Sequence, residues 1–155
     1  MMARKNLFAL ISLCSLMTCG CTGVIEDGKD DGGKDQNKTV AVSITGSAQK
    51  GPLTKGSQIT AFPLDETLTA TGQSFPGTVI DNLGNFRING NCSDPYLELR
   101  ADGYYYSEFY GTVSEAPLYL EALVSPNSSR VNLNLLTTII NPRVKKLILD
   151  GASYD

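Results

Sequence analysis

The 155-residue chain contains no histidine and no tryptophan, and it has only four cysteines. Without histidine, a serine or cysteine nucleophile has no imidazole base, so histidine-assisted nucleophilic catalysis is excluded. A zinc site is not indicated either, because neither a histidine nor a second cysteine pair is present to complete four ligands. The sequence therefore predicts no catalytic residue, no cofactor and no metal ligand.

Carboxylates are present but are not arranged as a catalytic pair. The sequence from Asp81 to Asn85 (DNLGN) resembles a fragment of a calcium loop, but it lacks the full Asp-x-Asx-x-Asx-Gly spacing. The remaining acids are scattered over expected strand ends and faces, which does not indicate glycosidase chemistry: Asp65, Glu66, Glu98, Glu108, Glu115 and Glu121. We therefore expect a protein that is not an enzyme.

The chain also lacks an excess of basic residues, and its formal net charge is -3. Loss of residues 1–20 would remove Arg4 and Lys5 and no acidic residue, so that -3 becomes -5. Nucleic-acid binding calls for basic patches. We therefore expect no nucleic-acid partner.

No apolar run reaches the length of a membrane span. The run from Leu7 to Met17 follows Arg4 and Lys5, and a basic start before a short apolar run is typical of a secretory signal. A spanning helix needs roughly 20 apolar residues, so this run is too short to cross a bilayer. The first 20 residues are therefore predicted to be an export signal.

The residues after this run resemble the lipobox of bacterial lipoproteins, in which a small residue precedes the cysteine that is lipidated. Gly20 lies directly before Cys21. Thr18 departs from the usual Leu or Val, while the frame ending at Cys19 places Leu16 correctly but puts Thr18 before the cysteine. The resemblance implies lipidation of Cys21, with Cys19 as the alternative. An ordinary signal peptide is the other interpretation.

Residues 21–38 begin with this cysteine and continue as TGVIEDGKDDGGKDQNK, with almost nothing apolar. Such a segment cannot bury enough surface to fold, so it is predicted to be a disordered tether. Its acidic residues resemble the surface-export signals of Bacteroidetes lipoproteins. The resemblance implies an outer-membrane protein held by acyl chains such as palmitate and exposed at the cell surface. The periplasmic side and a plain spacer remain open.

From Thr39 onwards, short runs alternate apolar and polar residues between glycine, proline and asparagine. Strands of this length and spacing predict an antiparallel sandwich or barrel, and we expect a single antiparallel β-sandwich of about seven strands over 39–135. Two turns are predicted, one with Gly84 in DNLGN and one at Asp102-Gly103.

If Cys21 is lipidated after removal of the signal, Cys92 is the one remaining thiol. It cannot pair within the chain, and we expect it in a loop.

Part of this region resembles the carboxypeptidase-regulatory-like, transthyretin-like β-sandwich. That family combines a Pro-Leu-x-x-Gly-x-x-Val turn and strand with a later Asp-x-x-Gly-x-Phe. The matching residues are Pro52, Leu53, Gly56, Ile59, Asp81, Gly84 and Phe86. The resemblance implies the sandwich fold and, since members are generally accessory modules beside peptidases, transporters and adhesins, a role without catalysis.

The richest aromatic segment is YYYSEFYGTV, residues 104–113. As one strand, it would direct Tyr105, Phe109 and Val113 towards the core. The opposite face would carry a row of tyrosines around Glu108. Tyrosine is enriched at interfaces and stacks on sugar rings, so these residues are the candidate face for a glycan or protein partner: Tyr104, Tyr106 and Tyr110.

Residues 136–155 are predicted to be helical. Asn141 suits an N-cap, Pro142 a first helical position and Gly151 a C-terminal cap. Proline inside one continuous helix would cost about 3 kcal/mol, so we expect a turn and then a separate helix. The apolar stripe of this helix consists of Val144, Leu147 and Ile148. We expect it to be covered by an open end of the sandwich, by a second copy, or by chain beyond residue 155.

The run Asn134 to Thr137 (NLLT) is similar to a step from sandwich into helix in a further set of bacterial lipoproteins. Together these features predict a non-enzymatic cell-envelope lipoprotein, a tethered sandwich for binding, adhesion or spacing. The alternative is the N-terminal accessory domain of a larger lipoprotein that processes peptides or glycans. A transthyretin-like carrier of small molecules is a third possibility.

Overall fold

The computed structural model describes residues 39–154. The predicted signal, Cys19, Cys21 and the tether lie in residues 1–38, outside the described residues. Within the described part, no helix is long and apolar enough to cross a membrane.

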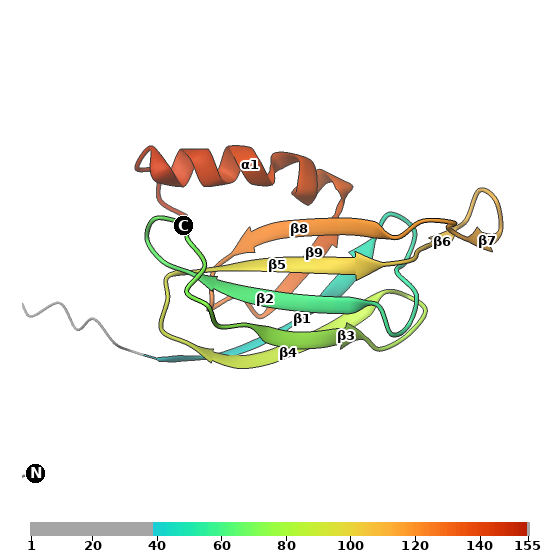
Figure 1. Ribbon diagram of the computed structural model, residues 1–155, viewed down its shortest axis with the longest axis horizontal. Helices are drawn as coiled ribbons and strands as arrows, with labels where there is room; N and C mark the ends of the chain where they lie inside the picture. The colour runs from blue at the N-terminus through green and yellow to red at the C-terminus, as the bar shows by residue number, and fades with distance from the viewer. Residues whose placement is uncertain (1–38, 155) are drawn as a thin grey trace, which may run out of the picture. The chain divides into compact units, whose positions relative to one another are not determined.

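The described chain is mostly strand and ends in one helix (Figure 1). Seven strands join in one sheet of order β8-β5-β2-β3-β4-β1-β9, antiparallel except for the β1–β9 pair. The elements are β1 (Val40–Gln49), β2 (Gln58–Leu64), β3 (Phe75–Val79), β4 (Asn85–Cys92), β5 (Tyr96–Gly103), β6 (Tyr106–Ser107), β7 (Thr112–Val113), β8 (Leu118–Val124), β9 (Arg130–Asn134) and α1 (Leu135–Leu149).

The edge strands β8 and β9 contact each other, so the sheet curls until it is nearly closed. A mostly β domain with a C-terminal helix is confirmed. Hydrogen bonding links the seven strands continuously and does not divide them into two facing sheets. The two-sheet sandwich is therefore not confirmed.

The core lies inside the curled sheet and follows from the alternation in the sequence. Inward positions are apolar and fully or almost fully buried, and together they form one cluster that includes Ile44, Ile59, Phe86, Ile88, Leu97, Leu99, Leu120 and Leu133. Burial of each such side chain contributes about 1.5–3 kcal/mol. Cys92 belongs to this cluster at the end of β4, so its expected place in a loop is wrong. Burial raises the pKa of its thiol.

The turn between β3 and β4 forms where the sequence predicts it. Gly84 has φ 79°, the left-handed conformation that glycine adopts without strain. Asp81 Oδ1 accepts hydrogen bonds from the backbone N–H groups of Leu83 (3.0 Å) and Asn85 (3.1 Å). The carboxylate therefore holds the turn closed, which is the role that DNLGN suggests.

The turn predicted at Asp102-Gly103 is wrong, because both residues lie in β5. Asp102 pairs with Tyr119 and Gly103 with Leu118 of β8. A Cβ on Gly103 would lie 2.1 Å from the Ser57 hydroxyl oxygen. Glycine is therefore required there by close packing rather than by turn geometry.

The helix begins earlier than predicted and passes through its proline. Asn134 is the N-cap: its Oδ1 accepts from the Thr137 N–H (3.0 Å), and Thr137 Oγ1 accepts from the Asn134 N–H (3.0 Å). This reciprocal pair satisfies two backbone donors at the helix start, and it confirms the step into helix at NLLT. Pro142 lies inside α1, so the expected second helix and the Asn141 N-cap are wrong. Gly151, with φ 95°, follows the C-cap as predicted.

Helix α1 runs along the outer side of β8 (Figure 1). As an edge strand, β8 has backbone groups on one side that no neighbouring strand satisfies. Thr138 Oγ1 accepts from the Glu121 N–H (3.0 Å), and Asn141 Oδ1 accepts from the Leu123 N–H (2.9 Å). The Tyr154 hydroxyl donates to the Leu123 carbonyl (3.0 Å). Side chains from the C-terminal segment therefore occupy the place of a further strand.

Candidate functional site

The aromatic segment 104–117 leaves the sheet between β5 and β8 and forms a projecting hairpin. Strands β6 and β7 pair at Tyr106–Val113 and Ser107–Thr112. The tip closes at Gly111, which has φ 68° and donates its N–H to the Ser107 carbonyl (2.8 Å). The single strand predicted over 104–113 is therefore wrong, because a glycine turn interrupts it.

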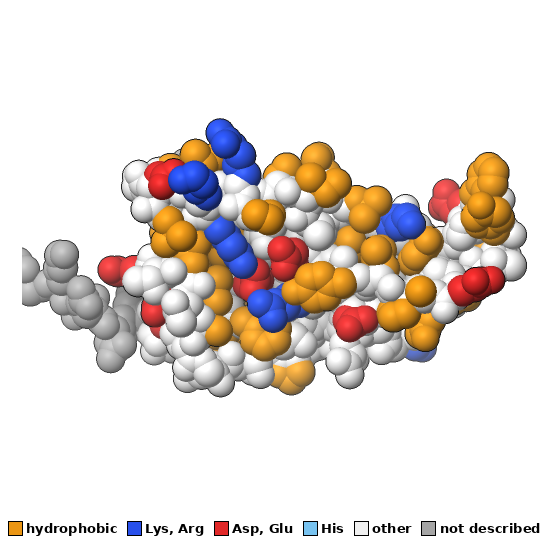
Figure 2. Space-filling model, turned by 45° about the horizontal axis from the view of Figure 1, so that its top comes forward, with side chains coloured by type: hydrophobic (Ala, Val, Ile, Leu, Met, Phe, Trp, Pro, Cys, Tyr) orange, Lys and Arg blue, Asp and Glu red, His pale blue; other side chains and the backbone are white. Residues whose placement is uncertain are grey.

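This turn changes which aromatic residues are buried. Tyr105 packs against the core as expected. Phe109 is 86% exposed and Val113 is 50% exposed, so their expected burial is wrong. Phe109 and Tyr110 (76% exposed) meet edge to face at the tip, with ring centroids 4.9 Å apart. The hydrophobic tip at the right of Figure 2 is this end of the molecule. This exposed aromatic pair on a projecting turn is accessible to another molecule.

Tyr105 forms a fixed floor beside the hairpin. Its hydroxyl accepts a hydrogen bond from Lys50 Nζ (2.8 Å), and the same ammonium lies 4.5 Å from the ring centroid. Its backbone N–H donates to Ser114 Oγ (3.2 Å), and its carbonyl accepts from the Ser114 N–H (2.9 Å). The ring is therefore held by Lys50, which directly follows β1, and the Tyr105 backbone is held by Ser114 in the connection between β7 and β8.

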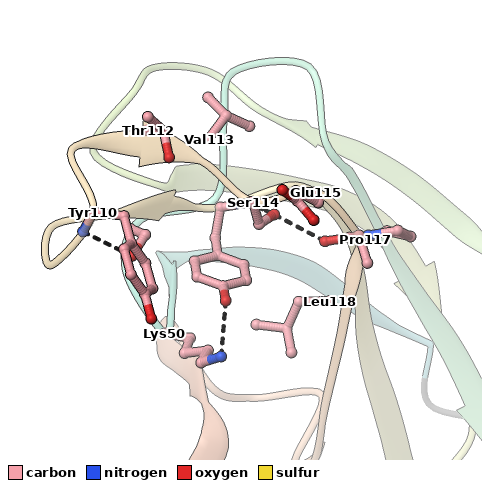
Figure 3. A pocket seen from close by; sticks show the side chains of 11 residues that line it. Lys50, Tyr110, Thr112, Val113, Ser114, Glu115, Pro117 and Leu118 are labelled. Carbon is pink, nitrogen blue, oxygen red and sulfur yellow. Dashed lines mark hydrogen bonds between the residues drawn. The ribbon is translucent and has the colours of Figure 1, made fainter.

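A hollow of about 790 Å³, open to solvent, lies against this floor (Figure 3). Its walls come from the hairpin and the segment before β8. They combine aromatic rings with hydroxyls, one ammonium and one carboxylate: Lys50, Tyr105, Ser107, Tyr110, Thr112, Ser114, Glu115 and Leu118. The volume lies within the range of small-ligand sites, and an apolar wall with a few polar groups is their usual composition.

The three predicted tyrosines do not form one face. Tyr110 lines the hollow just described. Tyr106 lines a smaller one of about 360 Å³ on another side of the hairpin, with Pro52, Thr54 and Asn82. Tyr104 lines neither of these hollows. Its carbonyl accepts from the Thr54 N–H (2.8 Å) at the base of the hairpin.

Several lining residues were missed by sequence reasoning. Lys50 is distant in the chain and comes close because Tyr106 N–H donates to the Pro52 carbonyl (2.9 Å). Ser114 and Glu115 follow the hairpin in a segment without strand pattern. The available signal was Gly111, since glycine inside a strand pattern indicates a bulge or a bend.

A second polar cluster lies beneath α1. Glu98, only 2% exposed, is ion-paired with Lys145 and with Arg100 (2.6 Å), and it accepts from Asn141 Nδ2 (3.3 Å). Asn141 Nδ2 also donates to Glu121 Oε1 (2.8 Å). Burial raises the pKa of Glu98, but hydrogen bonds from Lys145 and Arg100 outweigh it and hold the pKa below its ordinary value. This carboxylate is therefore ionised and fully engaged in joining helix to sheet.

The described residues contain no cluster suited to a metal ion. In the region 39–154, no group of three or more His, Cys, Asp or Glu side chains is placed to hold a metal ion. The Glu98 cluster is occupied by its own partners, and Glu115 lines the hollow beside Tyr110. What this hollow provides is surface for stacking and hydrogen bonding. No protein-family model, curated protein or solved structure matches the chain.

Proposed function

We propose that this protein is a non-enzymatic, lipid-anchored binding module of the cell envelope, and that the β6–β7 hairpin with the hollow beside it binds a carbohydrate. The observation that carries the proposal is the exposed Phe109–Tyr110 pair next to a floor formed by Tyr105. Aromatic rings stack on the apolar faces of sugars, while hydroxyl, ammonium and carboxylate groups bond to sugar hydroxyls.

The anchor and the tether belong to the same proposal. The basic start, the short apolar run and Gly20-Cys21 support export and lipidation. The acidic residues after Cys21 support an address at the outer face of the outer membrane. Held at that face, the hairpin would meet ligands outside the cell.

The relationship to carboxypeptidase-regulatory-like domains is part of the proposal as well. Leu53 and Ile59 are fully buried, and Gly56 has φ 91°, as a turn between them requires. Gly84 closes the β3–β4 turn before buried Phe86. These roles support a family of accessory modules without catalysis.

The test is binding of the full-length protein to a glycan array, followed by titration of the oligosaccharides that bind. Tyr110→Ala removes one wall of the hollow and is expected to weaken binding by up to about tenfold, since a stacked ring contributes about 0.5–1.5 kcal/mol. Tyr104→Ala is the matched control, because that tyrosine is 47% exposed but does not line the hollow. Equal losses in the two variants, or binding untouched by Tyr110→Ala, would contradict the site.

A further inference from the structure

Helix α1 is turned with its polar side to the sheet and much of its apolar surface outwards. The sheet-facing positions include Thr138, Asn141 and Lys145, each bonded to β5 or β8. The apolar residues at other positions are well exposed: Leu135 40%, Leu136 66%, Ile139 73%, Ile140 44%, Leu147 43% and Leu149 59%. A surface helix of a globular protein normally shows the opposite arrangement.

The contacts of α1 explain how this orientation is held. Asn141 is 1% exposed and bonds to Leu123, Glu98 and Glu121. The ion pair of Lys145 with Glu98 adds a second tie. Because these polar bonds fix the helix, its apolar residues are left on a rigid element at the surface (Figure 2).

Charge indicates what covers this surface. Leu135–Leu149 contains Arg143, Lys145 and Lys146 and no acidic residue, in a chain whose net charge is -3. Lys145 turns inwards to Glu98, and Lys146 is ion-paired with Asp150 (2.8 Å), whereas Arg143 is exposed among the apolar residues. A row of exposed Leu and Ile with a basic side chain among them favours contact with an anionic membrane, because a basic residue near such a surface contributes about 1 kcal/mol.

We propose that α1 lies flat on an anionic lipid surface through Leu136, Ile139, Ile140 and Leu147, with Arg143 at the lipid phosphates. At 1.5 Å per residue the helix is about 22 Å long, shorter than a hydrocarbon core of about 30 Å, so it fits the interface rather than a span. Proximity to the membrane rests on the lipid anchor proposed above, and one acyl chain plus a second attachment binds far better than either alone.

A second copy fits this surface less well. Two-fold contacts between copies are self-complementary, so each residue near the axis meets its own equivalent. Arg143 lies near the middle of the apolar row. With a two-fold axis near Arg143, its guanidinium would face the same group of the other copy, which disfavours a dimer centred on this face.

The test uses a fluorescent reporter in the full-length protein. The chain has no tryptophan, so Ile139→Trp introduces a single emitter on α1. Leu83→Trp, at a position 66% exposed in the β3–β4 turn, is the matched control. Each variant is mixed with vesicles of phosphatidylcholine, with or without phosphatidylglycerol, and with brominated lipids as quenchers.

With anionic vesicles, the reporter of Ile139→Trp is expected to shift to the blue and be quenched by brominated chains, while that of Leu83→Trp does neither. Arg143→Gln in the Ile139→Trp background is expected to weaken this response by about fivefold. An unquenched reporter at position 139 overturns the proposal. A blue shift without vesicles that grows with protein concentration also overturns it, because a second copy then covers the helix.

The same samples separate this inference from the lipid anchor. Intact mass shows whether Cys21 is acylated. Acylated protein with an unquenched reporter at position 139 would overturn the lipid-facing helix and leave the anchor standing. Unacylated protein with a quenched reporter would overturn the anchor and leave the lipid-facing helix standing. Glycan binding depends on the hairpin and is unaffected by either outcome.

Discussion

The inner and outer faces of β5 are attached to their surroundings by different interactions. Inwards, Leu97 and Leu99 are fully buried in an apolar core. Outwards, Glu98 is joined to α1 by its ion pair with Lys145 and by a hydrogen bond from Asn141, and it also pairs with Arg100 of the same strand. Apolar burial contributes in proportion to area, whereas polar contacts contribute little net energy but are costly to leave half made. The core therefore supplies stability, and the helix interface supplies a fixed orientation.

The largest effect should come from the inner face. Leu99→Ala removes a fully buried side chain and leaves a cavity, and we expect the free energy of unfolding to fall by about 2–5 kcal/mol. Urea unfolding followed by circular dichroism measures it. Ile80→Ala, at a position 56% exposed, should change stability by less than about 0.5 kcal/mol. A similar loss in both variants would show that the core is not packed as described.

Breaking the outer face should have a smaller and more local effect. Asn141→Ala leaves the Leu123 N–H without its acceptor and takes a donor from Glu98 and Glu121. We expect a loss of about 1–3 kcal/mol. Amide exchange should accelerate in α1 and β8, while β1 and β4 stay protected. Uniform acceleration over all strands would mean that the helix is part of the cooperative core.

The stability contributed by the outer face of β5 should depend on pH, whereas that of the inner face should not. The pKa of Glu98 lies below its ordinary value of 4.5, so the folded state favours the ionised form. The stabilisation is present above pH 4.5 and is lost as the pH falls through the lower folded pKa. Acid should therefore weaken the attachment of α1, whereas the apolar contacts of Leu99 carry no such dependence.

Urea unfolding at a series of pH values checks this for the wild type and Glu98→Gln. The variant should be less stable at neutral pH by about 1–3 kcal/mol. It should also lose less stability on acidification. Some dependence of stability on pH remains in both proteins, because the pKa values of Asp65 and Asp81 are lowered by hydrogen bonds from Thr67 and Asn85. Parallel pH curves would contradict the role given to Glu98.

Sequence reasoning succeeded where the determining interactions are local. Alternation in β1 and β4 specifies which side chains enter the core, and Asp81 with Gly84 specifies a turn within five residues. The cap at Asn134 is also local, since the partner is Thr137. These features depend on neighbours in the chain.

The errors arise where distant contacts decide. Gly103 looks like a turn residue, but its requirement comes from Ser57 on another strand. Asn141 looks like a helix cap, yet its amide bonds to β5 and β8 and helps keep Pro142 within a helix. The predicted tyrosine face was wrong for a similar reason. The turn at Gly111 places Tyr106 and Tyr110 in different hollows.

The side-chain caps on β8 have a consequence for contacts between molecules of this protein. An uncovered sheet edge acts as a template on which strands of neighbouring molecules add, and such growth leads to aggregates. Thr138, Asn141 and Tyr154 already occupy the backbone groups that would start this growth. The C-terminal segment thus prevents polymerisation through β8, and it does so only while α1 stays attached to that strand.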